Sequence, residues 1–74
     1  MEYVEEIKRY IRDTEKRIAD IKVSLRESAM YLKNNSEDEL AAWLKDEYRD
    51  QLNCNERHLK MLIKERLSLK DYYG

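Results

Sequence analysis

The chain has 74 residues, of which 42% are charged and 42% hydrophobic, with no proline and one glycine. This length permits one domain with a thin core, and the shortage of turn-forming residues excludes a fold rich in β-strands. A single cysteine excludes an intramolecular disulfide, so oligomerisation is the simplest remaining source of extra stability. The formal net charge of −1 gives no general sign of nucleic-acid or acidic-lipid binding.

The sequence also bears on where the protein works. No segment resembles a signal peptide, and no apolar run approaches the roughly 18 residues that span a bilayer. Together with the free cysteine, this predicts a cytoplasmic protein without a membrane partner.

A heptad pattern predicts the first long helix, over residues 2–33. Its seam positions alternate in spacings of three and four: Val4, Ile7, Ile11, Thr14, Ile18, Ile21, Leu25, Ser28 and Leu32. A period of 3.5 residues keeps such a stripe facing a partner helix along its whole length. An isolated helix of this kind is marginal in water, so we expect packing against another helix to hold it.

A short polar segment at residues 34–36 predicts the turn. Asn34 and Asn35 tolerate the left-handed conformation that ends helices, and Ser36 with Glu39 has the spacing of a capping box. We therefore expect the second helix to begin at residue 37. A connection this short brings that helix back antiparallel to the first.

The second helix is expected over residues 37–73. Its predicted seam contains one extra four-residue step, a stutter, between residues 44 and 52: Ala41, Leu44, Tyr48, Leu52, Asn55, Leu59, Leu62, Arg66, Leu69 and Tyr73. Asn53 and Glu56 could form a second cap, which would break the helix near residues 53–55 and give a three-helix bundle. The continuous helix is favoured because the seam continues through this segment, and the register then pairs Ile11 with Leu59 and Ile7 with Leu62 or Ile63.

The apolar side chains exceed what a two-helix hairpin needs. Five of them fall toward the turn and form the predicted partner-binding patch: Val23, Met30, Tyr31, Leu40 and Trp43. Exposed aromatic and aliphatic side chains together are typical of interface hot spots. The patch would serve either as the interface of a homodimer, giving a four-helix bundle, or as the docking site for a separate protein.

Basic residues give the only indication of nucleic-acid binding. Two triads would gather at the open end of the hairpin, where they could contact phosphates: Arg9, Arg12 and Lys16, with Arg57, Lys60 and Lys64. Acidic residues are interleaved with both triads, which favours a solvated mixed surface instead. Cys54 and His58 are spaced to share a helix face, but two ligands are too few for a closed zinc site, and no third group completes a nucleophilic site.

These patterns predict a single all-α domain over residues 1–74, a coiled-coil-like antiparallel hairpin that dimerises into a four-helix bundle. We expect a non-enzymatic protein-binding module, without cofactor or metal, that regulates or inhibits a larger protein. Two alternatives stay open, a nucleic-acid-associated protein and a purely structural coiled-coil subunit.

Overall fold

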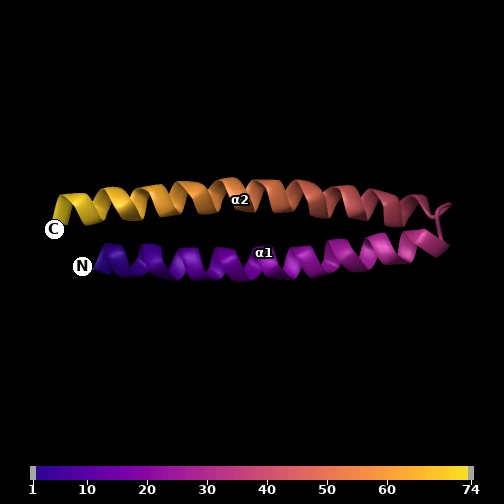
Figure 1. Cartoon of the computed structure of the whole chain (residues 1–74), viewed down its shortest axis with the longest axis horizontal. Coiled ribbons are helices and arrows are strands. Elements are labelled where there is room, and N and C mark those ends of the chain that lie inside the picture. Colours follow the sequence, from indigo (N-terminus) through magenta and orange to yellow (C-terminus); the bar gives the residue numbers. More distant parts are fainter. Residues whose placement is uncertain (1, 74) are drawn as a thin grey trace.

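The fold is an antiparallel pair of long helices (Figure 1). The computed structural model describes the backbone of residues 2–73 and the side chains of residues 3–69. Helix α1 spans Glu2–Asn34 and helix α2 spans Glu39–Tyr73, and together they form a rod whose Cα atoms extend over 55 × 14 × 13 Å. The predicted all-α hairpin is confirmed. Because α2 runs through residues 53–55 without a break, the three-helix alternative is wrong.

The seam of α1 is buried as its heptad pattern predicts. Ile7, Ile11, Ile18 and Ile21 are buried, and Thr14 among them is only 4% exposed. The remaining predicted seam residues are all half-buried: Val4, Leu25, Ser28 and Leu32. The apolar spacing of α1 therefore decides which side of the helix meets α2.

The seam of α2 differs from the prediction near the turn. Its half-buried or buried residues at heptad spacing are Ala41, Lys45, Tyr48, Leu52, Asn55, Leu59, Leu62 and Leu69. Glu47 beside the seam is half-buried as well, and Arg66, predicted for the seam, is exposed. The side chain of Tyr73 lies outside the described residues. The predicted stutter is therefore wrong. Lys45 takes the seam position, where its aliphatic stem can cover apolar surface, and Leu44 lies beside the seam with 37% exposure.

The turn comes slightly later in the chain than predicted. Helix α1 continues through Asn34, and the side-chain amide of Asn35 donates a hydrogen bond to the carbonyl oxygen of Tyr31 at 2.9 Å. The backbone N–H of Asp38 then donates to the carbonyl oxygen of Asn35 at 3.0 Å. These bonds satisfy groups that a helix end leaves without partners, and they close the turn over residues 35–38.

Asp38, and not Ser36, caps α2. The backbone N–H of Ala41 donates to Oδ1 of Asp38 at 3.0 Å, which is the bond expected from an N-cap side chain to the third helical residue. Helix α2 therefore begins at Glu39, two residues later than the predicted start, and the Ser36–Glu39 capping box is wrong. An aspartate directly before the helix also places its charge at the positive end of the helix dipole.

The core is small, and its largest buried cluster lies toward the open end of the hairpin. Ile7, Ile11 and Leu62 form this cluster, with Leu59 and Leu69 packed against it, and Ile18 and Ile21 are buried farther along α1. The cluster joins Ile7 and Ile11 with Leu62 and Leu59, as expected from the register that pairs Ile11 with Leu59 and Ile7 with Leu62 or Ile63. Among the described side chains none is less than 2% exposed, so the monomer has little fully enclosed apolar volume.

Over the described residues, neither helix contains a segment that is both long enough and apolar enough to cross a membrane.

Candidate interaction surface

The two seams divide the remaining surface into four sides. The a residues of α1 are Val4, Ile11, Ile18, Leu25 and Leu32, and its d residues are Ile7, Thr14, Ile21 and Ser28. The a positions of α2 are Lys45, Leu52, Leu59 and Arg66, and its d residues are Ala41, Tyr48, Asn55, Leu62 and Leu69. In an antiparallel pair, the residues that precede each a residue face one another along one flank, and the residues that precede each d residue lie on the same flank, farther toward the outward side. The residues that follow each d residue face one another along the opposite flank, and those that follow each a residue lie beyond them. The outward positions of α1 and α2 lie on opposite sides of the rod. The hydroxyl of Tyr3 in α1 donates a hydrogen bond to a carboxylate oxygen of Glu65 in α2, which identifies these two residues as neighbours on the first flank.

The first flank collects the larger part of the exposed apolar side chains, and we call it the tyrosine flank. Three belong to α1 and three to α2: Tyr3, Tyr10, Tyr31, Leu40, Leu44 and Met61. Their exposed fractions range from 37% for Leu44 to 71% for Met61. A surface of this composition in a chain of this size is typical of a protein-binding site.

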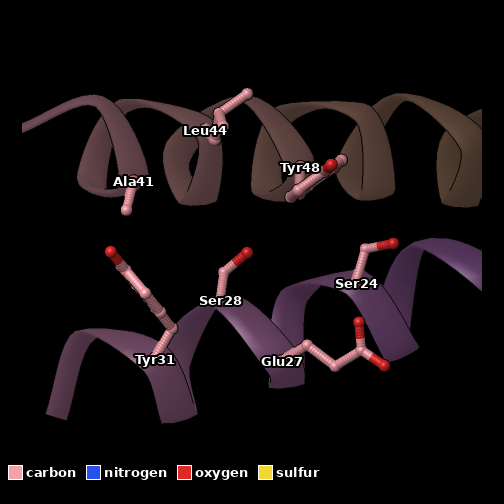
Figure 2. Close-up of a pocket in the computed structure, with 7 residues that line it drawn as sticks. All are labelled: Ser24, Glu27, Ser28, Tyr31, Ala41, Leu44 and Tyr48. Carbon is pink, nitrogen blue, oxygen red and sulfur yellow. The ribbon is translucent and has the colours of Figure 1, made fainter. Parts of the chain in front are cut away.

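A shallow depression of about 290 Å³ opens on the tyrosine flank near the turn (Figure 2). It exists because the seam residues Ser28 and Ala41 are both small, so the facing helices leave space between them. Its lining comes from both helices: Ser24, Glu27, Ser28, Tyr31, Ala41, Leu44 and Tyr48. In Figure 2 the side chains of Ser28 and Tyr31 point toward α2, and Leu44 points away from α1.

Hydrogen bonds hold two of the tyrosines at opposite ends of this flank. Tyr31 donates its hydroxyl to Oδ2 of Asp38 at 2.8 Å, and Tyr3 donates to Glu65. Each bond raises the pKa of its tyrosine, because the neutral phenol is the donor and the nearby carboxylate opposes a second negative charge. The pKa of Asp38 is lowered, first by the backbone N–H of Ala41 and then by the Tyr31 hydroxyl.

The tyrosine flank is also acidic. Every seventh residue of α1 from position 6 to position 27 is a carboxylate, and we call this row the acidic column: Glu6, Asp13, Asp20 and Glu27. Glu47 and Glu65 of α2 border the same flank. Its basic groups among the described side chains are Arg17 and the guanidinium of Arg9, which lies over the ring of Tyr10. Six carboxylates and two arginines give this flank a formal charge of −4, although the whole chain carries only −1.

The opposite flank has the reverse balance. It carries seven basic side chains, Lys8, Arg12, Lys22, Arg26, Lys33, Arg49 and Lys60, and five acidic ones, Glu5, Glu15, Glu39, Asp46 and Glu56. The ion pairs found among side chains 3–69 both lie there, Lys8 with Glu5 at 3.5 Å and Arg49 with Asp46 at 4.0 Å. Within the same range, the acidic column has no basic side chain close enough for an ion pair.

The structure distributes the predicted partner-binding patch over three sides. Val23 and Met30 lie on the outward side of α1, and Trp43 lies on the outward side of α2. Tyr31 and Leu40 lie on the tyrosine flank. All five side chains are exposed, by 47% to 67%.

The hydrophobic pattern alone does not place the tyrosines of α1 beside the exposed apolar residues of α2. It predicts Leu44 in the seam and gives no indication for Met61 or the acidic column. A signal was present, because heptad alignment places the tyrosines and Leu44 directly before a residues, and Met61 and the acidic column directly before d residues, on the same flank. The alignment of α2 depends on Lys45, a charged residue that hydrophobic periodicity does not assign to a seam.

The basic residues proposed to contact phosphates share the open half of the hairpin but not one side. Arg9 and Lys16 point outward from α1, and Arg57 and Lys64 point outward from α2. The third members of the triads, Arg12 and Lys60, lie on the opposite flank.

Cys54 and His58 are both exposed, where α2 borders the tyrosine flank. Across the part of the chain that the structure describes, no group of three or more His, Cys, Asp and Glu side chains could hold a metal ion.

Comparison of the chain with protein-family models, with curated proteins and with solved structures finds no match. The proposed function therefore rests on the chemistry of the protein's surface.

Proposed function

We propose that this chain is a non-enzymatic protein-binding module that regulates or inhibits a larger protein by packing its helices against the partner. The observation that carries this proposal is the excess of exposed over buried apolar side chains. Among the described side chains, eleven large hydrophobic residues are exposed, and five hydrophobic residues are buried. Leaving this much apolar area in water forgoes roughly 25 cal/mol per Å² that a partner would recover on binding.

Self-association is the second use that this excess would serve. Two hairpins that buried part of it would form the four-helix bundle expected from the sequence, and the chain would then act as a structural subunit or as a dimeric regulator. Its thin core favours such an arrangement, because oligomerisation supplies the burial that a small chain lacks.

A nucleic-acid role has weaker support. The basic triads point to three different sides of the rod, so a single phosphate backbone could contact only part of the set. The spread of the basic residues over three sides favours protein binding over nucleic-acid binding.

The cytoplasmic location expected from the sequence stays a prediction.

The test is the solution mass, measured by light scattering after size exclusion across a concentration series, for the wild type and Trp43→Ala. A wild-type dimer that Trp43→Ala converts to a monomer would show that the surplus serves self-association. A wild-type monomer would leave the apolar surface free for another protein. A monomer that also fails to bind any amphipathic helical peptide would contradict the proposal.

A further inference from the structure

We propose that the tyrosine flank binds a basic amphipathic α-helix of a partner protein. Aliphatic side chains of that helix would lie against the flank, and its lysine and arginine side chains would lie beside the acidic column. This inference rests on the proposed protein-binding function and adds the side of the hairpin that is used and the chemistry of the partner.

The shape of the flank suits a third helix. It runs along both helices from Tyr3 at the open end to Tyr31 at the turn, and its six apolar side chains belong to both α1 and α2. A helix laid along two antiparallel helices buries its apolar stripe against both of them. The hydrogen bonds of Tyr3 and Tyr31 hold the two ends of the surface in place, which lowers the entropy cost of binding.

The depression near the turn provides an anchor point. Its volume of about 290 Å³ can accept one large aliphatic or aromatic side chain between Tyr31, Leu44 and Tyr48. Glu27 stands in its lining, so a lysine or arginine one turn away on the partner helix would meet a carboxylate. This end of the flank therefore favours a partner helix with a large apolar side chain and, one turn away, a lysine or arginine.

Charge decides between a foreign helix and a second copy of this chain. A symmetric dimer through the tyrosine flank would bring two surfaces of formal charge −4 into one interface, and like charges placed together oppose association. Pairing the tyrosine flank with the basic opposite flank of another copy would repeat without closing and give open chains of molecules. A basic helix from another protein satisfies the acidic column without either consequence.

The tyrosine rings add attraction for cations. The guanidinium carbon of Arg9 already lies 5.9 Å from the centroid of the Tyr10 ring, within the range of a cation–π interaction. Lysine and arginine side chains of a partner helix would find the same kind of contact along the flank.

The test is isothermal titration calorimetry of the full chain with two synthetic peptides of about 21 residues, long enough to span roughly 30 Å as a helix. Both carry leucine at the a and d positions of three heptads, and they differ only in having lysine or glutamate at the polar positions. The basic peptide is expected to bind at least about tenfold more tightly than the acidic one. Its affinity is expected to fall as the salt concentration rises, because the contacts with the acidic column are exposed.

Two pairs of substitutions locate the binding side. We expect the double substitution Asp13→Lys with Asp20→Lys, in the acidic column, to lower the affinity for the basic peptide by at least about tenfold. Asp46→Lys with Glu56→Lys makes the same change of charge on the opposite flank and is expected to change affinity by less than about threefold. Asp13→Asn with Asp20→Asn replaces the lysine pair if circular dichroism shows that the latter does not fold.

Each contrary outcome has a distinct meaning. Equal binding of both peptides would overturn the proposed partner chemistry and leave the protein-binding function standing. Equal losses of affinity in Asp13→Lys with Asp20→Lys and in Asp46→Lys with Glu56→Lys would have the same meaning. A stable wild-type dimer that Tyr10→Ala converts to a monomer would show that a second copy occupies the flank, and would also overturn the inference. Binding of neither peptide by a monomeric chain would overturn the inference that this flank binds a helix, whereas the protein-binding function is tested separately by the solution mass of the wild type and Trp43→Ala.

Discussion

Tyr31 near the end of α1 donates its hydroxyl to Oδ2 of Asp38, the residue that caps α2, at 2.8 Å. The same carboxylate accepts the backbone N–H of Ala41 through its other oxygen. One side chain therefore satisfies the start of α2 and ties it to α1, so that the turn and one end of the tyrosine flank are fixed by a single group.

Replacing Asp38 tests this double role. We expect Asp38→Ala to lower the melting temperature by roughly 4 °C or more, because it removes the cap of α2 and the acceptor of the Tyr31 hydroxyl. Asp38→Asn keeps an acceptor for the Ala41 N–H, so we expect a smaller fall in its melting temperature. Thermal unfolding followed by circular dichroism measures both, and equal melting temperatures for Asp38→Ala and the wild type would refute the cap.

The pKa shifts predict how stability depends on pH. The pKa of Asp38 is lowered from 3.8 in the folded chain, so its contribution is present above about pH 4 and is lost as the pH falls through the folded pKa. The pKa of Tyr31 is raised from 10.0, so its contribution is present below pH 10 and is lost as the pH rises through the folded pKa. Melting temperatures across pH are expected to show a shallower acid fall for Asp38→Asn and a shallower alkaline fall for Tyr31→Phe. Unchanged slopes in both variants would contradict this account of the turn.

The small core makes single cavities costly. Ile11→Ala removes a side chain that is only 6% exposed from the cluster with Ile7 and Leu62, and we expect a loss of about 2 kcal/mol or more in the free energy of unfolding. Val23→Ala is the matched control on the outward side of α1, where we expect a change within about 0.5 kcal/mol. Urea denaturation gives both values, and similar losses would mean that Ile11 does not lie in the core.

The unbroken seam of α2 can be tested with two neighbouring residues. Lys45→Leu places an apolar side chain in the seam and is expected to raise the melting temperature, whereas Leu44→Lys, beside the seam, is expected to cost less than about 1 kcal/mol. If the seam contained the stutter, Leu44 would be the seam residue, and Leu44→Lys would be the more damaging change. A loss of several kcal/mol in Leu44→Lys, measured by urea denaturation, would restore Leu44 to the seam.

The hairpin could be predicted from the sequence because aliphatic residues fill almost every seam position of α1. Aliphatic residues at heptad spacing from Val4 to Leu32 leave one possible seam, and the polar segment near Asn35 leaves one place for the turn. Within α2 the same reasoning failed at Lys45, since a periodic analysis prefers the adjacent leucine and does not consider the aliphatic stem of a lysine.

The candidate surface was harder to predict than the fold. Val23, Met30 and Trp43 were grouped by their nearness to the turn along the rod, but the side of a helix depends on the phase of its seam. The misplaced seam residue in α2 hid that Leu44 shares a flank with Tyr10 and Tyr31. The choice of cap also needed coordinates, because Ser36 and Asp38 are both good N-cap residues a short distance apart.

Amide chemical-shift changes in the ¹⁵N-labelled chain, mapped as the basic peptide is added, test whether the tyrosine flank binds another helix. We expect the largest changes around Tyr10, Tyr31, Leu44 and Met61, and little change at Val23 and Trp43 on the outward sides. Changes centred on Val23, Met30 and Trp43, or spread evenly over all sides of the rod, would contradict binding at this flank.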